Sequence, residues 1–173
     1  GGHHKGKRGK DSENKQPTLL ILSTLEDNNY PQYVKLHTLT NYKGEPIEEY
    51  LKEKCLFDPT IVINCDRDKA FFCLNKLAQL ENSVVDYTKE NHKLKWLNTF
   101  IGNIQSNINH LYRLVKKRDL PLFLSEQEWR INHRYSGKRI MDKVKKYISM
   151  STPVTFKQIT NSVLAYEKQF LSA

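Results

Sequence analysis

A run of seven residues, TIVINCD at positions 60–66, constrains the fold more than any other part of the chain. Ile61, Val62 and Ile63 are apolar and β-branched, and a continuous run of this kind between turn signals predicts a strand buried on both faces of a mixed sheet. Asp66 ends the run, and α/β folds place their chemistry at the carboxyl ends of central strands. The alternative is that Asp66 only caps the next helix, since aspartate is a common N-cap residue.

The elements predicted around this strand follow the order of an α/β fold. Alternating apolar and polar residues on either side of a turn-forming segment predict an antiparallel hairpin near the start of the chain. The predicted elements, in chain order, are strands over 18–26 and 33–39, a helix over 47–54, the strand ending at Asp66, a helix over 68–80 and a strand over 83–87.

Helices are predicted for the rest of the chain. Apolar residues at spacings of three and four from Leu94 to Val115 predict one long amphipathic helix. Further helices are predicted over 120–134, 140–150 and 156–171. The whole order predicts an RNase H-like mixed sheet flanked by helices, with its first strand missing and a helical C-terminal part.

The predicted domain organisation has three parts. Residues 1–16 contain almost no apolar side chain, so they are expected to form a basic flexible arm or loop. Residues 17–153 are expected to form the RNase H-like core, truncated at its N-terminus, and residues 154–173 a helical tail.

The charge balance favours a polyanionic partner. The chain has 28 Lys and Arg against 19 Asp and Glu, a net charge of +9, and nucleic acid is the commonest partner of so basic a domain. A basic but merely solvated surface is the alternative. The three cysteines are odd in number and form no CxxC pair, which favours reduced intracellular thiols over a disulfide framework or zinc site. No run is long enough to predict a membrane span.

Four segments carry a resemblance to a known family. They are GGHHKGKRGK at the start, INCDRDKAF around Asp66, WLNTFIGNIQSNI on the long predicted helix, and LPLFLSEQEWRINHR at 120–134. On these segments the chain resembles the catalytic domain of bacterial insertion-sequence DDE transposases related to Merlin elements, over residues 1–153. The last segment, with Glu126, Arg130, Asn132 and Arg134, is the most specific.

The resemblance implies a metal-dependent DNA transposase that cleaves strands and joins the released 3′ hydroxyl to target DNA. It places the second metal-binding carboxylate at Asp66 and the third catalytic position at Asn103, with the first aspartate just upstream of Gly1. The implied cofactor is Mg²⁺ or Mn²⁺ in a two-metal site. Asp68 and Asp86 are reserve candidates for a second ligand, but Asp68 is expected rather to cap the helix that follows it. Taken without the resemblance, Asn103 is a polar residue on the exposed side of a helix.

The implied partners are double-stranded DNA, as terminal repeats and target, and further copies of the chain in a homodimer or larger synaptic complex. The expected location is the bacterial cytoplasm, at the nucleoid, with no membrane contact. The residues expected to contact DNA are all cationic: Lys5, Lys7, Arg8, Lys10, Lys116, Lys117, Arg118, Arg130 and Arg134. The alternative for Arg130 and Arg134 is that they pair with Glu126 and Glu128 inside a helical layer.

Two other functions remain open at this stage. The first is a non-catalytic DNA-binding remnant that keeps the fold and charge but has lost the metal site. The second is an RNase H-like nuclease or resolvase with another substrate. In the transposase interpretation, this chain is a truncated copy of low or no activity, because its first carboxylate is absent.

Overall fold

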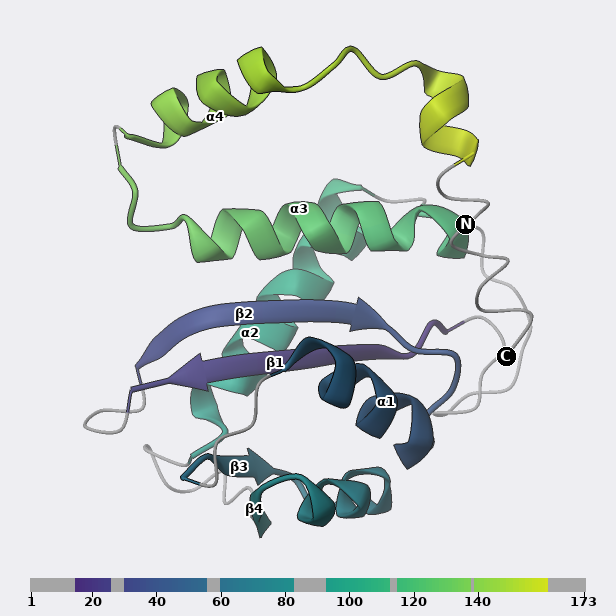
Figure 1. Ribbon diagram of the computed structural model, residues 1–173, viewed down its shortest axis with the longest axis vertical. Helices are drawn as coiled ribbons and strands as arrows, with labels where there is room; N and C mark the ends of the chain where they lie inside the picture. The colour runs from purple at the N-terminus through teal and green to yellow at the C-terminus, as the bar shows by residue number, and fades with distance from the viewer. Residues whose placement is uncertain are drawn as a thin grey trace. The chain divides into compact units, whose positions relative to one another are not determined.

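The computed structural model describes residues 15–25, 30–55, 60–82, 93–112, 115–137 and 139–161. The chain divides into two compact units, residues 1–114 and 115–173. The elements of unit 1 (Figure 1) are β1 (Thr18–Thr24), β2 (Pro31–Thr38), α1 (Gly44–Lys54), β3 (Val62–Cys65), η1 (Lys69–Lys76), β4 (Gln79–Asn82), α2 (Lys95–Ser106) and η2 (Asn107–Leu111). Those of unit 2 are η3 (Lys117–Asp119), α3 (Leu120–Asn132) and α4 (Arg139–Met150). The fold is mixed α/β, as predicted.

The predicted hairpin is confirmed. β1 and β2 pair antiparallel from Thr18 with Thr38 to Leu22 with Val34, and the register shifts just after Leu22. Because side chains alternate along a strand, Leu19 points to the face that α1 covers, whereas Val34 and Leu36 point to the other. α2 contacts β1 and lies behind the hairpin in Figure 1, with α1 in front.

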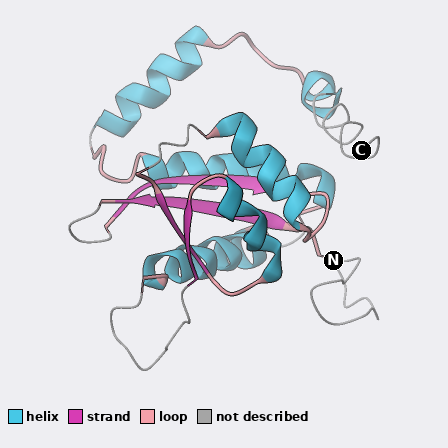
Figure 2. Ribbon diagram, turned by 60° about the horizontal axis from the view of Figure 1, so that its bottom comes forward, coloured by secondary structure: helices cyan, strands magenta, loops and turns pink. Residues whose placement is uncertain are grey.

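The strand before Asp66 is shorter and more exposed than predicted. β3 pairs in parallel with β4, from Val62 with Gln79 to Cys65 with Asn82, and this pair is separate from the hairpin (Figure 2). In the described part of the chain β3 has this one neighbour, so Val62 is 42% exposed. The prediction of a strand buried on both faces is therefore wrong for this structure, and Cys65 is the buried residue of β3.

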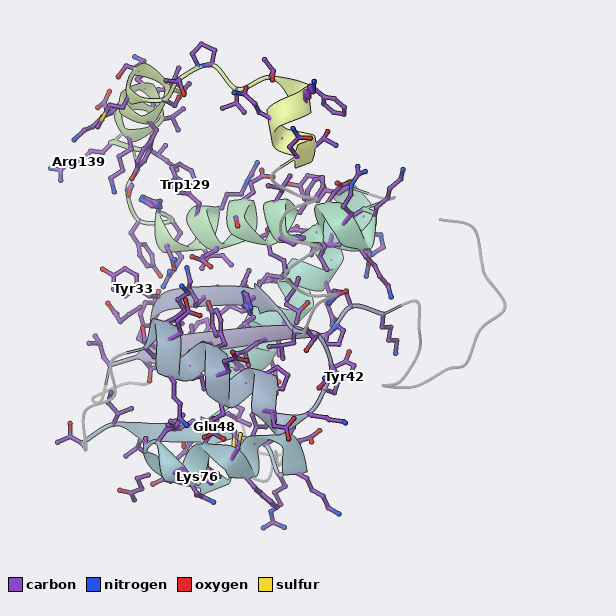
Figure 3. All side chains as sticks on the ribbon, turned by 45° about the vertical axis from the view of Figure 1, so that its right-hand side comes forward. Tyr33, Tyr42, Glu48, Lys76, Trp129 and Arg139 are labelled. Carbon is purple, nitrogen blue, oxygen red and sulfur yellow. The ribbon has the colours of Figure 1, made fainter. Side chains whose placement is uncertain are left out.

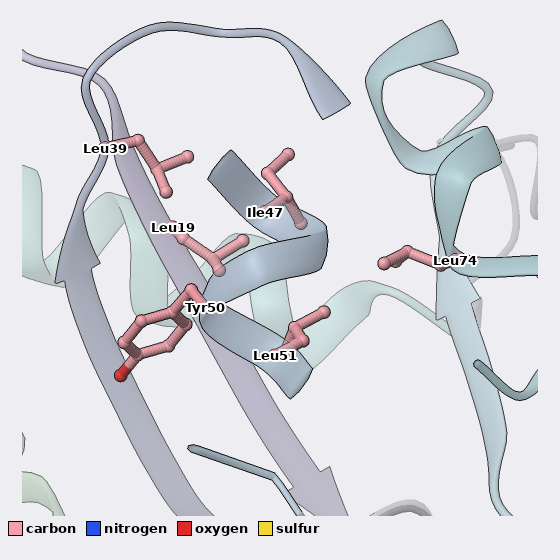
Figure 4. Packing of buried hydrophobic residues seen from close by; sticks show 6 residues of the cluster. All are labelled: Leu19, Leu39, Ile47, Tyr50, Leu51 and Leu74. Carbon is pink, nitrogen blue, oxygen red and sulfur yellow. The ribbon is translucent and has the colours of Figure 1, made fainter. Parts of the chain in front are cut away.

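One apolar core joins the hairpin, α1 and η1. It is built on six buried residues (Figure 4): Leu19, Leu39, Ile47, Tyr50, Leu51 and Leu74. Ile63 of β3 and Leu80 of β4 pack against it from the second pair of strands. His37 of β2 stacks on the Tyr50 ring of α1, with ring centroids 3.9 Å apart. Both apolar and aromatic contacts therefore pack α1 against the hairpin.

α1 begins at a close contact with η1. A Cβ atom on Gly44 would lie 2.8 Å from the carbonyl oxygen of Ala70, so only glycine fits without a shift of the backbone. The Cys73 Sγ donates to the carbonyl oxygens of Gly44 at 3.3 Å and Ala70 at 3.2 Å. Burial raises the pKa of Cys73, and the nearby Glu48 carboxylate raises it further.

Two helices differ from the prediction. The helix after Asp66 is a 3₁₀ helix ending at Lys76, and β4 begins at Gln79, where helix was still expected. The long helix predicted up to Val115 ends as α-helix at Ser106 and continues as a π-helical turn, η2. The strand predicted at 83–87 lies outside the described residues.

Unit 2 contains the α3 helix as predicted, with a proline in its first turn. Leu124 and Gln127 of α3 are buried, whereas α4 has no buried residue. A shallow apolar groove within this unit is lined by Trp129 of α3 and by Val144, Tyr147 and Ile148 of α4. No helix in the described ranges is long and apolar enough to cross a membrane.

Candidate active site

Asp66 lies immediately after β3, in an exposed turn. Its Oδ1 accepts a hydrogen bond from the backbone N–H of Asp68 at 3.1 Å. This bond holds one oxygen of the exposed carboxyl group close to the end of the strand. The neighbouring Cys65 is buried, and burial raises its pKa, as does the charge of Asp66 to a smaller extent. An exposed, oriented carboxylate at a strand end can accept a proton or bind a cation.

Asp68 is a helix cap. Its side chain accepts a hydrogen bond from the backbone N–H of Ala70 at 3.1 Å, at the start of η1. The two aspartates therefore share the turn between β3 and η1: Asp66 binds the N–H of Asp68, and Asp68 binds that of Ala70. The expectation that Asp68 caps its helix is confirmed, while Asp86 lies outside the described residues.

Asn103 is exposed on α2, one turn before the π-helical segment. Its backbone carbonyl accepts from the N–H of Asn107, where the helix widens. In the described ranges, no hydrogen bond or ion pair joins Asn103 to Asp66. The structure thus presents Asp66 and Asn103 as two separate exposed oxygen donors, a carboxyl group and an amide.

The described residues contain no group of three or more His, Cys, Asp or Glu side chains that could hold a metal ion. Mg²⁺ takes about six oxygen ligands, usually one or two protein carboxylates together with waters and substrate phosphates. Asp66 and Asn103 have the right donor chemistry for Mg²⁺ or Mn²⁺ but supply only one carboxylate, which is too few to hold two ions. A complete site would need at least one further carboxylate from outside the described residues.

Most described cations that were expected to contact DNA already have partners in the chain. The Arg118 Nε donates to Asp119 at 2.8 Å, and the Arg130 guanidinium donates to Glu126 at 2.7 Å. The Arg134 Nη1 donates to the carbonyl oxygen of Ile131 at 2.8 Å, and its guanidinium lies over the Tyr135 ring.

The other expected DNA contacts lie at the start of η3 or in the N-terminal arm, which is outside the described residues. Lys116 and Lys117 are exposed, before and within η3. The four cations of the arm lie outside the described residues: Lys5, Lys7, Arg8 and Lys10. Sequence reasoning did not single out the cations of α4, although their spacing along one helix was visible in the sequence.

An α/β domain with a carboxylate at a strand end and a net charge of +9 fits the class of proteins that act on nucleic acid. A family model described as the ISXO2-like transposase domain matches residues 1–132. The chain therefore belongs to the ISXO2-like transposase family. Comparison with curated proteins gives no match, and neither does comparison with solved structures.

Proposed function

We propose that this chain is part of a DNA transposase of an insertion sequence, related to Merlin elements, that cleaves DNA strands and transfers them to target DNA. The observation that carries the proposal is the position of Asp66, an exposed and oriented carboxylate at the end of β3 within the region matched by the family. A carboxylate in that place suits the phosphoryl-transfer chemistry of transposition.

The arrangement of the strands supports an RNase H-like sheet whose first strand lies upstream. β1 and β3 each pair with one neighbour in the described structure, although both contribute side chains to one core through Leu19 and Ile63. A strand inserted between β1 and β3 would join the two pairs into one mixed sheet. We propose that residues N-terminal to Gly1 supply this strand and end in the first catalytic carboxylate.

In this proposal Asp66 and Asn103 complete the metal site together with the upstream carboxylate. The bound Mg²⁺ or Mn²⁺ ions would activate a nucleophile and stabilise the leaving oxygen. Asp66 contributes the negative charge, and its hydrogen bond to the N–H of Asp68 holds one oxygen in place. Asn103 contributes a neutral amide oxygen, which binds a hard cation more weakly than a carboxylate does.

The proposed partners are double-stranded DNA and a second copy of the transposase in a homodimer or larger synaptic complex at the nucleoid. We propose that residues 1–16 act as a basic arm, residues 17–153 as the catalytic core and residues 154–173 as a tail. Lys116 and Lys117 are exposed cations of the expected set.

Manganese binding to the purified chain tests the role of Asp66. We expect weak Mn²⁺ binding, measured by the electron paramagnetic resonance signal of the free ion, and a further loss on the order of tenfold in Asp66→Asn because a ligand is removed. Asp142→Asn is the matched control, since it removes an exposed carboxylate on α4 by the same change. Equal binding by all three proteins would exclude Asp66 as a ligand.

One observation favours a second candidate, a DNA-binding remnant without catalysis. Position 103 carries a neutral amide, Asn103, in place of a third carboxylate. A protein extended upstream through the first strand discriminates the two functions. Metal-dependent cleavage of terminal-repeat DNA by the extended protein supports the transposase, and DNA binding without cleavage supports the remnant. The chain of 173 residues alone is expected to cleave little or no DNA.

A further inference from the structure

α4 has an excess of positive charge and lies beyond the region matched by the family, which ends at residue 132. Four cations and one carboxylate, Asp142, stand on its polar side. We call the four cations the basic face of α4: Arg139, Lys143, Lys145 and Lys146. All four residues are exposed.

The basic face is not neutralised by carboxylates of the described chain. Arg139, Lys145 and Lys146 form no ion pair with any described residue, and Lys143 donates only to the hydroxyl oxygen of Ser136 at 3.1 Å. Figure 3 shows the Arg139 side chain extending outward from α4. Unpaired cations at this density repel one another, so an added polyanion lowers their electrostatic energy.

The apolar side of α4 determines which way the basic face points. Val144, Tyr147 and Ile148 border the groove that contains Trp129 of α3. A helix turns by about 100° per residue, so residues at spacings of four and three share one side. Arg139, Lys143 and Lys146 follow this spacing, on a stripe about 10 Å long that lies away from the centre of the groove. Lys145 lies about 100° around the helix from Lys146, at the edge of the basic face.

We propose that the basic face of α4 binds the phosphate backbone of DNA, as a contact surface additional to the matched transposase domain. This inference rests on the proposed function, because that function makes DNA the available polyanion. Lysines with no carboxylate partner can release counterions from DNA without first breaking an ion pair. The α3 cations Arg130 and Arg134 would have to leave Glu126 and the Ile131 carbonyl to bind phosphates through the same atoms.

The test compares two triple variants of the full chain that lose the same charge. The first, Lys143→Gln/Lys145→Gln/Lys146→Gln, removes three lysines of the basic face. The control, Lys52→Gln/Lys54→Gln/Lys93→Gln, removes three lysines of unit 1 that pair with Glu48, Glu53 and Glu81. Binding to a fluorescein-labelled random-sequence duplex is measured by anisotropy over a range of salt concentrations, and circular dichroism checks that both variants are folded.

The α4 variant is expected to bind the duplex on the order of tenfold more weakly than the unchanged chain. The magnitude of the negative slope of log K against log salt should decrease by about 2 to 3. The control should change both quantities far less. Equal losses in the two variants would mean that only net charge matters, and would overturn the proposal. An unchanged slope in the α4 variant would overturn it as well.

A second measurement separates DNA from an anionic membrane, which a basic amphipathic helix can also bind. If the α4 variant binds phosphatidylserine vesicles more weakly but binds the duplex as well as the unchanged chain does, the partner is a lipid surface and the proposal is overturned. Failure of the proposed function looks different. It would leave the DNA result in place and make Asp66→Asn indistinguishable from Asp142→Asn in Mn²⁺ binding.

Discussion

α1 and α4 have similar length but different charge and opposite environments. Both are amphipathic helices, of 11 and 12 residues; α1 has four Glu and two Lys, whereas α4 has three Lys, one Arg and one Asp. α1 buries Ile47, Tyr50 and Leu51 in the core of unit 1, whereas α4 has no fully buried residue. An amphipathic pattern therefore predicts that a helix has an apolar side, and the surfaces around it decide how much of that side is covered.

The two helices also differ in whether their charged side chains form ion pairs. On α1, Lys52 pairs with Glu48 at 2.6 Å and Lys54 pairs with Glu53, so its surface carries local ion pairs. On α4 the lysines outnumber the single carboxylate. The Lys52 and Lys54 charges of α1 are therefore offset within the helix, whereas three cations of the basic face of α4 form no ion pair with a described residue and Lys143 donates only to Ser136. α1 is thus a core helix, and the basic face of α4 is the surface that we propose binds DNA.

The largest expected effect comes from truncating one isoleucine in each helix. Ile47→Ala should lower the free energy of unfolding by about 2 to 5 kcal/mol, because it leaves a cavity among buried side chains. Ile148→Ala should change it by less than about 0.5 kcal/mol, because that residue is 68% exposed. Urea denaturation followed by circular dichroism measures both. Equal losses would show that the two helices are equally buried in solution.

A smaller effect is expected where α1 meets η1. Gly44→Ala should lower stability by about 1 to 3 kcal/mol, because the new methyl group would overlap the carbonyl oxygen of Ala70. Gly102→Ala is the matched change in α2, where an added Cβ meets no atom within 4 Å. It should raise stability by up to about 1 kcal/mol, since alanine is the better helix former. If both variants are stabilised, the contact between Gly44 and Ala70 is looser in solution.

The smallest expected effect is a pH dependence at the contact between β2 and α1. Burial lowers the pKa of His37, as do Lys35 and Lys54, and Glu53 opposes them. Below pH about 6.5 the unfolded chain binds a proton that the folded chain resists, so stability should fall as the pH drops from there. His37→Phe, which keeps a ring against Tyr50, should flatten this dependence. His110→Gln, which changes an exposed histidine, is the control and should leave the pH dependence unchanged. If His37→Phe keeps the full pH dependence, the titrating group lies elsewhere.

Local patterns in the sequence predicted the elements near the N-terminus well. The hairpin followed from the alternation at 18–26 and 33–39, and α1 differs from its predicted helix only by an earlier start. The sequence did not predict that β3 would be exposed, since a run such as Ile61–Val62–Ile63 describes side chains and not the number of neighbouring strands. Nor did periodicity distinguish a continuous α-helix from one that widens at Asn107.

The sequence predicted local features of single residues in the candidate site but not whether those residues lie together. The position of Asp66 after a strand and the capping role of Asp68 both followed from residue type and place in the chain. The pairing of Arg130 with Glu126 was an open alternative that the structure supports. Whether Asp66 and Asn103 act together depends on long-range packing, which spacing along one sequence does not encode.

The three cysteines offer a way to follow the motions of unit 1. Cys55 follows α1, Cys65 belongs to β3 and Cys73 to η1, and burial raises the pKa of each thiol. Because the thiolate is the reactive form, the buried Cys65 sulfur should react with an alkylating reagent mainly when β3 opens, whereas the half-buried Cys55 and Cys73 are partly accessible in the folded chain. The labelling rate of Cys65, compared with the rates of the other two, would then report the local opening of β3.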